Sequence, residues 1–143
     1  MVIAVIGCGR ISGAHFPGLC NMEDVRIKYA CDILIEKAEA AKEKFPKIEK
    51  VTQDYQEVLA DPEVEAIWVL TPNYAHYTIT MDALRAGKHV MCEKPAGVYT
   101  LQVREMMAEA DKHPDLKFGM MFNQRTNHIY RKVKEIMAEK NSK

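Results

Sequence analysis

The sequence opens with Met1-Val-Ile-Ala-Val-Ile-Gly-Cys-Gly-Arg-Ile-Ser-Gly13, and this stretch decides the fold. Residues 2–6 form an unbroken apolar run, which is typical of a strand buried on both faces of a parallel sheet. Gly7, Gly9 and Gly13 follow it as G-x-G-x-x-G. In that motif the first glycine permits a tight turn, the second leaves room for a pyrophosphate, and the third lets the next helix pack closely on the strand. A glycine-rich loop can also be purely structural, so the motif alone leaves dinucleotide binding open.

The composition is that of one ordinary globular domain. The chain has 143 residues, of which 48% are hydrophobic and 28% are charged, so it can bury a sizeable core. The formal net charge is zero, and therefore neither nucleic acid nor an anionic membrane surface is an expected partner. No apolar run reaches the length of a signal sequence or a membrane span, and we expect a cytoplasmic protein.

The cysteines indicate neither a metal site nor a disulfide framework. The four residues form no C-x-x-C pair, and none has a histidine partner at zinc-ligand spacing. Cys8, Cys31 and Cys92 lie beside predicted strand ends, where we expect buried, reduced thiols.

Hydrophobic periodicity predicts strands and helices in strict alternation. The predicted strands are residues 2–6, 25–32, 50–52, 66–70, 90–92 and 116–121. The predicted helices are residues 14–22, 33–45, 55–60, 74–85, 101–112 and 129–139. This alternation indicates the α/β class with a Rossmann-type doubly wound parallel sheet, for which we expect six strands in the order 3-2-1-4-5-6. Residues 1–143 then form a single dinucleotide-binding domain.

Single residues refine the helix ends. Pro17 removes an amide donor inside the first helix and is expected to loosen or kink it. Gly87 is placed to end the fourth helix in the C′ position. The predicted N-caps are Asp54, with Glu57 completing a capping box, Asn73 and Thr100.

Polar residues follow the predicted strands at one edge of this sheet. In doubly wound sheets, ligands bind beyond the carboxyl ends of the strands, near the switch in strand order. Gly7–Gly13, Asp32, Thr71–Asn73, Glu93–Pro95 and Asn123–Arg125 occupy those positions. Asp32 comes nineteen residues after Gly13, close to the spacing at which a carboxylate binds an adenosine ribose, although it could instead cap the following helix. Structural needs alone do not gather such residues at one edge, so the sequence predicts a ligand site there.

Five motifs occur in a recognisable order: G-C-G-R-I-S-G-A-H at 7–15, A-C-D at 30–32, T-P-N-Y-A-H at 71–76, A-G-K-H-V-M-C-E-K-P-A-G at 86–97 and F-N-Q-R at 122–125. Together they resemble the N-terminal domain of the glucose–fructose oxidoreductase, inositol dehydrogenase and MocA family of NAD(P)-dependent oxidoreductases. The resemblance covers essentially the whole chain. It implies a full-length enzyme that transfers a hydride between a nicotinamide cofactor and a sugar, a cyclitol or a related hydroxyl or carbonyl compound.

The resemblance also implies residue roles. The glycine turn holds the pyrophosphate, Asp32 faces the adenosine ribose, and Lys94 reaches the place where substrate and nicotinamide meet. A lysine ammonium there can bind a substrate oxygen and stabilise developing alkoxide charge. Alternatively, Lys94 pairs with Glu93 on the surface, and His76 only packs within its helix. The candidate cofactor-binding residues are Gly7, Gly9, Arg10, Ile11, Gly13, Asp32, Thr71, Pro72, Asn73, His76 and Glu93, and the candidate catalytic residue is Lys94.

The cofactor expected from these residues is NAD, with NADP possible. A carboxylate at Asp32 repels a 2′-phosphate, and no arginine follows it directly. Lys37 is the nearest cation and is expected to point outward from its helix. The resemblance further implies a C-terminal substrate domain, absent from this chain, that supplies the proton-transfer histidine.

We therefore expect this chain to bind cofactor without turnover. We also expect it to form a homo-oligomer, because the last helix would expose its apolar face. Two other functions fit parts of the sequence. A stand-alone nucleotide-sensing or regulatory module would need only the cofactor edge. A methyltransferase can carry a similar glycine turn, but E-K-P at 93–95 and T-P-N at 71–73 argue against it.

Overall fold

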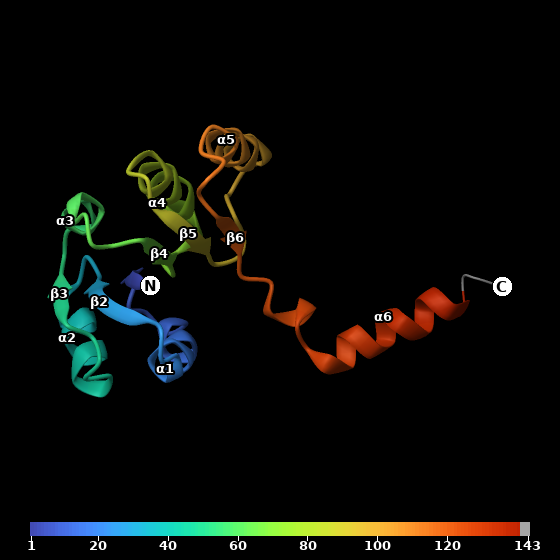
Figure 1. The fold of residues 1–143 in the computed structure, drawn as a ribbon, viewed down its shortest axis with the longest axis horizontal. Helices are drawn as coiled ribbons and strands as arrows, with labels where there is room; N and C mark the ends of the chain where they lie inside the picture. The colour runs from blue at the N-terminus through green and yellow to red at the C-terminus, as the bar shows by residue number, and fades with distance from the viewer. Residues whose placement is uncertain (141–143) are drawn as a thin grey trace.

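The apolar run after Met1 forms β1 (Val2–Ile6), an inner strand of the sheet in the computed structural model, which describes residues 1–140 (Figure 1). On one side of β1 lie β2 (Arg26–Cys31) and then β3 (Lys50–Thr52). On the other side lie β4 (Ala66–Val69), β5 (His89–Cys92) and β6 (Phe118–Met120). Neighbouring strands within the described residues pair in parallel, so the predicted order 3-2-1-4-5-6 is confirmed.

Helices cover both faces of the sheet, as a doubly wound fold requires. One buried cluster contains Phe16 and Ala38, from α1 (Ser12–Asn21) and α2 (Ile35–Lys44). The second cluster contains Val58 and Leu84, from α3 (Tyr55–Ala60) and α4 (Asn73–Arg85), and it packs beside α5 (Thr100–Asp111) through Ala110. Figure 1 accordingly shows α1 and α2 on one side of the sheet and α3, α4 and α5 on the other. The short 3₁₀ helix η1 (Asn123–Arg125) and α6 (His128–Lys140) follow β6.

Two predicted N-caps are wrong because the helices begin one residue earlier. Asn73 is the first residue of α4 and Pro72 precedes it as the cap, with no side-chain bond. Thr100 is the first residue of α5. The start of α5 is satisfied instead by Gln102, whose Oε1 accepts the Val98 N–H at 2.8 Å. Because the Gln102 side chain reaches back from the first turn to accept a backbone N–H that precedes the helix, no hydroxyl side chain is needed to cap α5.

The start of α3 is only partly as predicted. The Asp54 side chain accepts the Gln56 N–H at 2.8 Å, so Asp54 is confirmed as the N-cap. Glu57 does not complete a capping box, because its Oε2 accepts the Thr52 hydroxyl at 2.7 Å. Thr52 Oγ1 in turn accepts the Asp54 N–H at 3.2 Å, and this triangle joins the end of β3 to the helix.

The first helix tolerates its proline. α1 runs without interruption from Ser12 to Asn21 with Pro17 inside it, so Pro17 does not end the helix. α1 also starts two residues earlier than predicted, where the Ser12 hydroxyl donates to the Gly9 carbonyl at 2.7 Å. Gly87 ends α4 with a φ of +74°, as expected for a C′ glycine.

The cysteines are free in the described residues. Cys8, Cys31 and Cys92 are buried, which confirms the prediction, and burial is the largest of the effects that raise the pKa of each thiol to about 12. At neutral pH such thiols stay protonated and unreactive.

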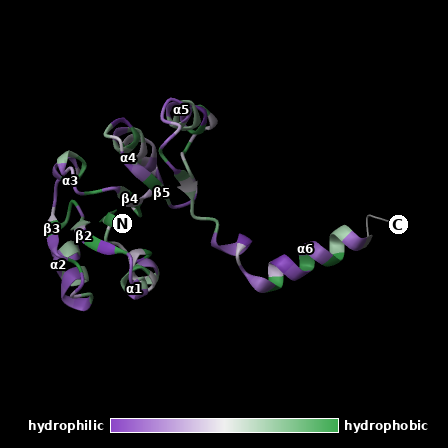
Figure 2. Ribbon diagram, in the orientation of Figure 1, coloured by the Kyte–Doolittle hydropathy of each residue, from purple (hydrophilic) through white to green (hydrophobic). Residues whose placement is uncertain are grey.

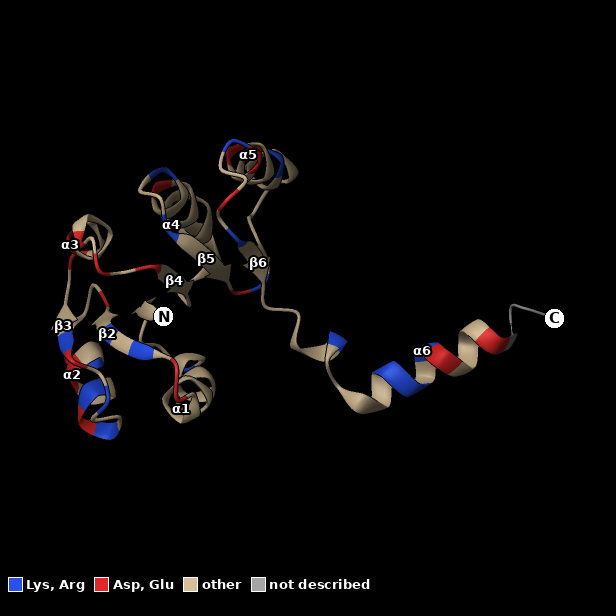
Figure 3. Ribbon diagram, viewed as in Figure 1, with Lys and Arg blue, Asp and Glu red and all other residues tan. Residues whose placement is uncertain are grey.

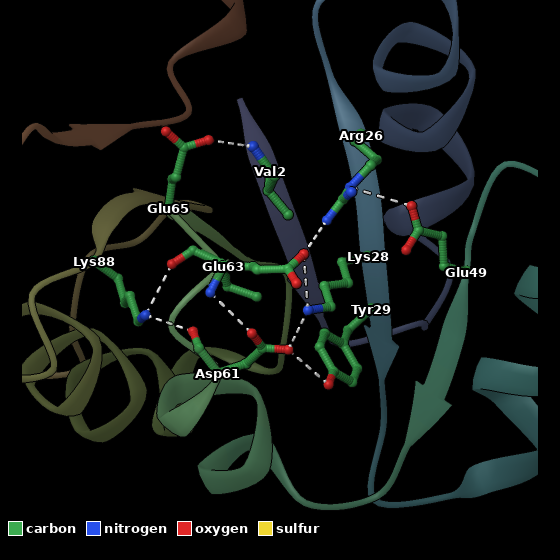
Figure 4. Close-up of polar contacts among 10 residues, drawn as sticks. Val2, Arg26, Lys28, Tyr29, Glu49, Asp61, Glu63, Glu65 and Lys88 are labelled. Carbon is green, nitrogen blue, oxygen red and sulfur yellow. Dashed lines mark hydrogen bonds and ion pairs between the residues drawn. The ribbon is translucent and has the colours of Figure 1, made fainter.

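A network of charged side chains ties β2 to the connection between α3 and β4 (Figure 4). Lys28 is buried, although its position in β2 alternates with apolar residues, and its Nζ lies 2.6 Å from Asp61 Oδ2 and 3.2 Å from Glu63 Oε2. The Tyr29 hydroxyl donates to the same Asp61 oxygen at 3.0 Å. The buried Lys88 ammonium donates to the Asp61 carbonyl at 2.8 Å, so side chain and backbone of Asp61 are both held.

This network predicts an acid-sensitive contribution to stability. The bond from the Lys28 ammonium lowers the pKa of Asp61 to about 2. Because the folded pKa is below the unfolded value, the contribution is fully present above about pH 4 and is lost as the pH falls through about 2. We expect the free energy of unfolding, measured in urea, to fall more steeply below pH 4 in the wild type than in Asp61→Asn. Glu23→Gln, at an exposed carboxylate, serves as the control. If the free energy of unfolding fell equally steeply below pH 4 in all three proteins, the Asp61 carboxylate would make no acid-sensitive contribution to stability.

The last helix has the apolar face that its periodicity predicts, and the face is exposed. Ile129, Val133, Ile136 and Met137 are between 43% and 60% exposed. α6 extends away from the sheet, with apolar segments along it (Figure 2). That this face drives self-association stays a prediction. Within residues 1–140, none of the helices has the length and apolarity that crossing a bilayer needs.

Candidate cofactor site

The glycine turn passes directly against the end of β4. Gly7 has a φ of +102°, and a Cβ built on it would lie 2.6 Å from the Leu70 carbonyl carbon and 2.7 Å from the Thr71 nitrogen. The Gly7 N–H donates to the Cys31 carbonyl at 2.7 Å. The first glycine therefore lies where β1, β2 and β4 all end, and only a residue without a side chain fits there.

The other two glycines of the motif face open space. A Cβ at Gly9 would meet no other atom within 4 Å, which is the room that a pyrophosphate needs. A Cβ at Gly13 would also meet nothing within 4 Å, so the predicted role of Gly13 in close helix–strand packing is wrong. α1 packs on the sheet through Phe16 instead, and Gly13 lies on the exposed side of the helix. Arg10 is likewise exposed, and Ile11 is 41% exposed.

Asp32 ties the end of β2 to the glycine turn. One carboxylate oxygen accepts the Cys8 N–H at 2.8 Å, and the other accepts the Leu34 N–H at 3.0 Å. The residue that caps α2 is Leu34, so Asp32 closes a turn before the helix, which begins at Ile35 rather than Ile33. A carboxylate has about four lone-pair sites, so both oxygens keep capacity for a further donor such as a ribose hydroxyl.

The turn after β4 holds an unsatisfied hydroxyl. Thr71 Oγ1 is buried and has no hydrogen-bond partner within the described residues, whereas Pro72 and Asn73 are exposed. A buried polar atom without a partner is costly and is common where a ligand or water completes the site. Together with the space at Gly9, this hydroxyl makes the edge compatible with a bound dinucleotide.

His76 acts on this edge differently from what the sequence predicts. Its ring is 1% exposed, with Nδ1 2.7 Å from the Pro95 carbonyl and Nε2 2.7 Å from the Thr71 carbonyl. Both neighbours are backbone carbonyl oxygens, which only accept hydrogen bonds. Since both nitrogens contact the backbone, His76 holds the Thr71 and Pro95 turns together and offers no free nitrogen to a cofactor.

Lys94 lies exposed beside a buried Glu93. The Glu93 carboxylate contacts His15 Nε2 at 2.9 Å through one oxygen and accepts the Lys94 backbone N–H at 3.0 Å through the other. The alternative in which the Lys94 ammonium pairs with Glu93 is therefore wrong, and no partner for that ammonium lies within residues 1–140. The Lys94–Pro95 peptide bond is cis.

Sequence reasoning did not assign His15 to this edge. Its side chain is 9% exposed and bonds to Glu93 across 78 residues of sequence. The one available signal was its place two residues after the last glycine of the motif. Arg125, by contrast, follows β6 at the predicted edge but stacks on Phe122, with its guanidinium carbon 5.0 Å from the ring centre.

Comparison with known proteins agrees with this geometry. The profile of the family described as "Oxidoreductase family, NAD-binding Rossmann fold" matches residues 1–120. The chain belongs to this family. The predicted resemblance to the glucose–fructose oxidoreductase, inositol dehydrogenase and MocA group is confirmed, and the chain is an NAD-binding Rossmann domain.

Its relatives in the oxidoreductase family are longer. Myo-inositol 2-dehydrogenase of Thermotoga maritima is 33% identical over 135 residues, which is 94% of this chain but 40% of that protein. The crystal structure of myo-inositol 2-dehydrogenase from Lactobacillus plantarum superposes with a TM-score of 0.90 at 30% identity, covering 99% of this chain and 42% of the other. A 3-ketoreductase from Actinomadura kijaniata, solved with NADP and TDP-benzene, gives a TM-score of 0.88 at 26% identity and covers 97% and 42%. The chain thus spans about two fifths of the length of these relatives.

Proposed function

We propose that this chain is the cofactor-binding part of an NAD-dependent oxidoreductase that acts on a sugar, a cyclitol or a related hydroxyl or carbonyl compound. The observation that carries the proposal is the makeup of one sheet edge. It presents an open glycine turn, a carboxylate with free lone pairs and an unpartnered ammonium, from Gly9, Asp32 and Lys94. The inositol dehydrogenases among the relatives support the substrate class.

Each of these groups has a role that follows from its chemistry. The pyrophosphate would occupy the space at Gly9, where the first N–H groups of α1 favour an anion. Asp32 would accept hydrogen bonds from the adenosine ribose. The bound nicotinamide would supply or take the hydride. The Lys94 ammonium would donate to the reacting substrate oxygen and stabilise negative charge on it.

The cofactor choice follows from Asp32, because its carboxylate repels the 2′-phosphate of NADP. Lys37, in the first turn of α2, is exposed, which fits the expectation that it points outward from its helix. NAD is therefore the proposed cofactor, with NADP possible.

The titration of this chain with NADH and NADPH, followed by nicotinamide fluorescence, tests the proposal. We expect the wild type to bind NADH more tightly than NADPH. Asp32→Asn should raise the NADPH affinity relative to NADH by about tenfold, which corresponds to about 1.4 kcal/mol of removed repulsion. Asp24→Asn, at an exposed carboxylate before β2, is the matched control. An unchanged ratio would refute the ribose role of Asp32, and no binding of either nucleotide by the wild type would refute the proposed function.

The role of Lys94 is tested in the longer protein that contains this chain. Lys94→Ala should lower kcat by about 10²–10³-fold, the usual effect of removing a donor to a developing oxyanion. The NADH dissociation constant should change little, because the ammonium acts on the substrate. Arg104→Ala removes an exposed cation from α5 and should leave kcat unaltered. Near-normal turnover of Lys94→Ala would remove Lys94 from the reaction.

The chain matches about two fifths of its relatives, and the proposal also assigns roles to the other three fifths of a protein of that length. They would bind the substrate and supply the proton-transfer histidine, so this chain alone would bind cofactor without turnover. Assembly of the whole protein into a homo-oligomer is part of the same proposal.

A further inference from the structure

Two side chains from distant parts of the sequence meet beneath Lys94. His15 lies on α1, directly after the glycine turn, and Glu93 follows β5. His15 Nε2 and Glu93 Oε1 are 2.9 Å apart, and each side chain is 9% exposed. A bond from an imidazole N–H to a buried carboxylate is charge-assisted and well shielded from water, so it is a strong one.

Glu93 passes this constraint directly to Lys94. Its second oxygen accepts the Lys94 backbone N–H at 3.0 Å, so the carboxylate bridges His15 and the backbone from which the Lys94 side chain departs. Without His15, a buried carboxylate oxygen would lose its donor, and the carboxylate would turn toward water. The Lys94 N–H would then lose a fixed acceptor.

The Lys94 turn is held from two sides. From α4, His76 Nδ1 bonds to the carbonyl of Pro95. From α1, His15 reaches the turn through Glu93. Of these two histidines, only His15 belongs to the helix whose start forms the proposed pyrophosphate site. The His15–Glu93 bond therefore links the helix at that site to the turn that carries Lys94.

We propose that His15 is a positioning residue that, through Glu93, places Lys94 relative to the glycine turn. This inference rests on the proposed function. His15 contacts Glu93 and acts on the reaction through it. If the bond only stabilised the fold, its loss would weaken the binding of every nucleotide alike.

The test uses two amides of different reach in place of the imidazole. His15→Gln carries its N–H group near the position of Nε2, whereas His15→Asn carries it near the position of Nδ1 and falls short of Glu93. The dissociation constants of NADH and of ADP-ribose, which lacks the nicotinamide, are measured for this chain. Amide hydrogen exchange at Lys94 is followed by NMR. His89→Asn, at the other end of β5 where His89 Nδ1 accepts the Lys117 N–H, is the control.

We expect His15→Asn to speed Lys94 amide exchange about tenfold and, in the longer protein that contains this chain, to lower kcat about tenfold, while the dissociation constants of NADH and ADP-ribose stay within about twofold of the wild type. His15→Gln should restore the exchange rate and kcat, and His89→Asn should lower the melting temperature without changing either. Parallel losses for the two nucleotides, or unchanged exchange at Lys94, would overturn the inference. If the wild type binds neither nucleotide, the proposed function fails by itself, and the exchange measurement still decides the link from His15 to Lys94. Should His15→Asn not fold, Glu93→Gln weakens the same bridge and is expected to give the same faster Lys94 amide exchange and lower kcat.

Discussion

Gly7→Ala should leave the chain largely unfolded. The new methyl group would lie 2.6–2.8 Å from three backbone atoms of Leu70 and Thr71, and none of them can move without displacing the chain at the end of β4. The φ of +102° adds strain for any residue with a Cβ. Strain of about 1–3 kcal/mol and overpacking of about 1–3 kcal/mol together approach the whole stability of a small domain. Urea unfolding followed by circular dichroism measures the loss.

Substitutions at two other glycines distinguish the effect of the steric clash from the effect of the backbone strain. Gly87 has a φ of +74° but open space at its Cβ position, so Gly87→Ala should cost only about 1–2 kcal/mol. Gly13 has neither constraint and lies in α1, so Gly13→Ala should be neutral or stabilise by up to about 1 kcal/mol. If Gly7→Ala were no worse than Gly87→Ala, the close approach of the turn to β4 would not matter for folding.

Gly9→Ala should have the opposite profile, with normal stability and poor cofactor binding. Its Cβ meets no protein atom, so the free energy of unfolding should stay within about 0.5 kcal/mol of the wild type. The methyl group would instead occupy the proposed pyrophosphate position. Overpacking of about 1–3 kcal/mol corresponds to a loss of about 5- to 150-fold in affinity. Both NADH and ADP-ribose should be affected, because both carry the pyrophosphate.

The matched control for Gly9→Ala is Gly18→Ala. Gly18 also has open space at its Cβ position, but it lies further along α1, away from the turn. Its substitution should leave nucleotide affinity unchanged. Wild-type affinity in Gly9→Ala would mean that the open space at Gly9 does not hold the pyrophosphate.

The identity of the fold was available from local patterns. Strand and helix periodicities differ, and each apolar run here has one clear period, so the alternation and the strand order could be predicted. Parallel strands bring their carboxyl ends to one edge, and for that reason the positions of Gly9, Asp32 and Lys94 at a common edge followed from the sequence.

The helix starts were harder to predict, because several side chains compete for the same N–H groups. Glu57 turned to Thr52 instead of completing a capping box, and Gln102 took the place of Thr100. Propensity ranks the candidates, but a bond to a neighbouring strand or loop decides among them. Gly13 is a similar case, because its motif predicts close packing and only the surrounding space shows that there is none.

By itself, the sequence determined the doubly wound architecture, the sheet edge at which the candidate cofactor residues gather and the family to which the chain belongs. The tertiary structure decided which hydrogen-bond partners the side chains at that edge have. It buried His76 between two carbonyls, paired Glu93 with His15 and thereby left the Lys94 ammonium free. Hydrogen bonds between residues far apart in the chain produce no periodicity or fixed spacing in the sequence. They depend on how α1, α4 and the end of β5 pack together, so they could not be predicted. The sequence thus placed the chemistry, and long-range hydrogen bonds determined which groups remain available for it.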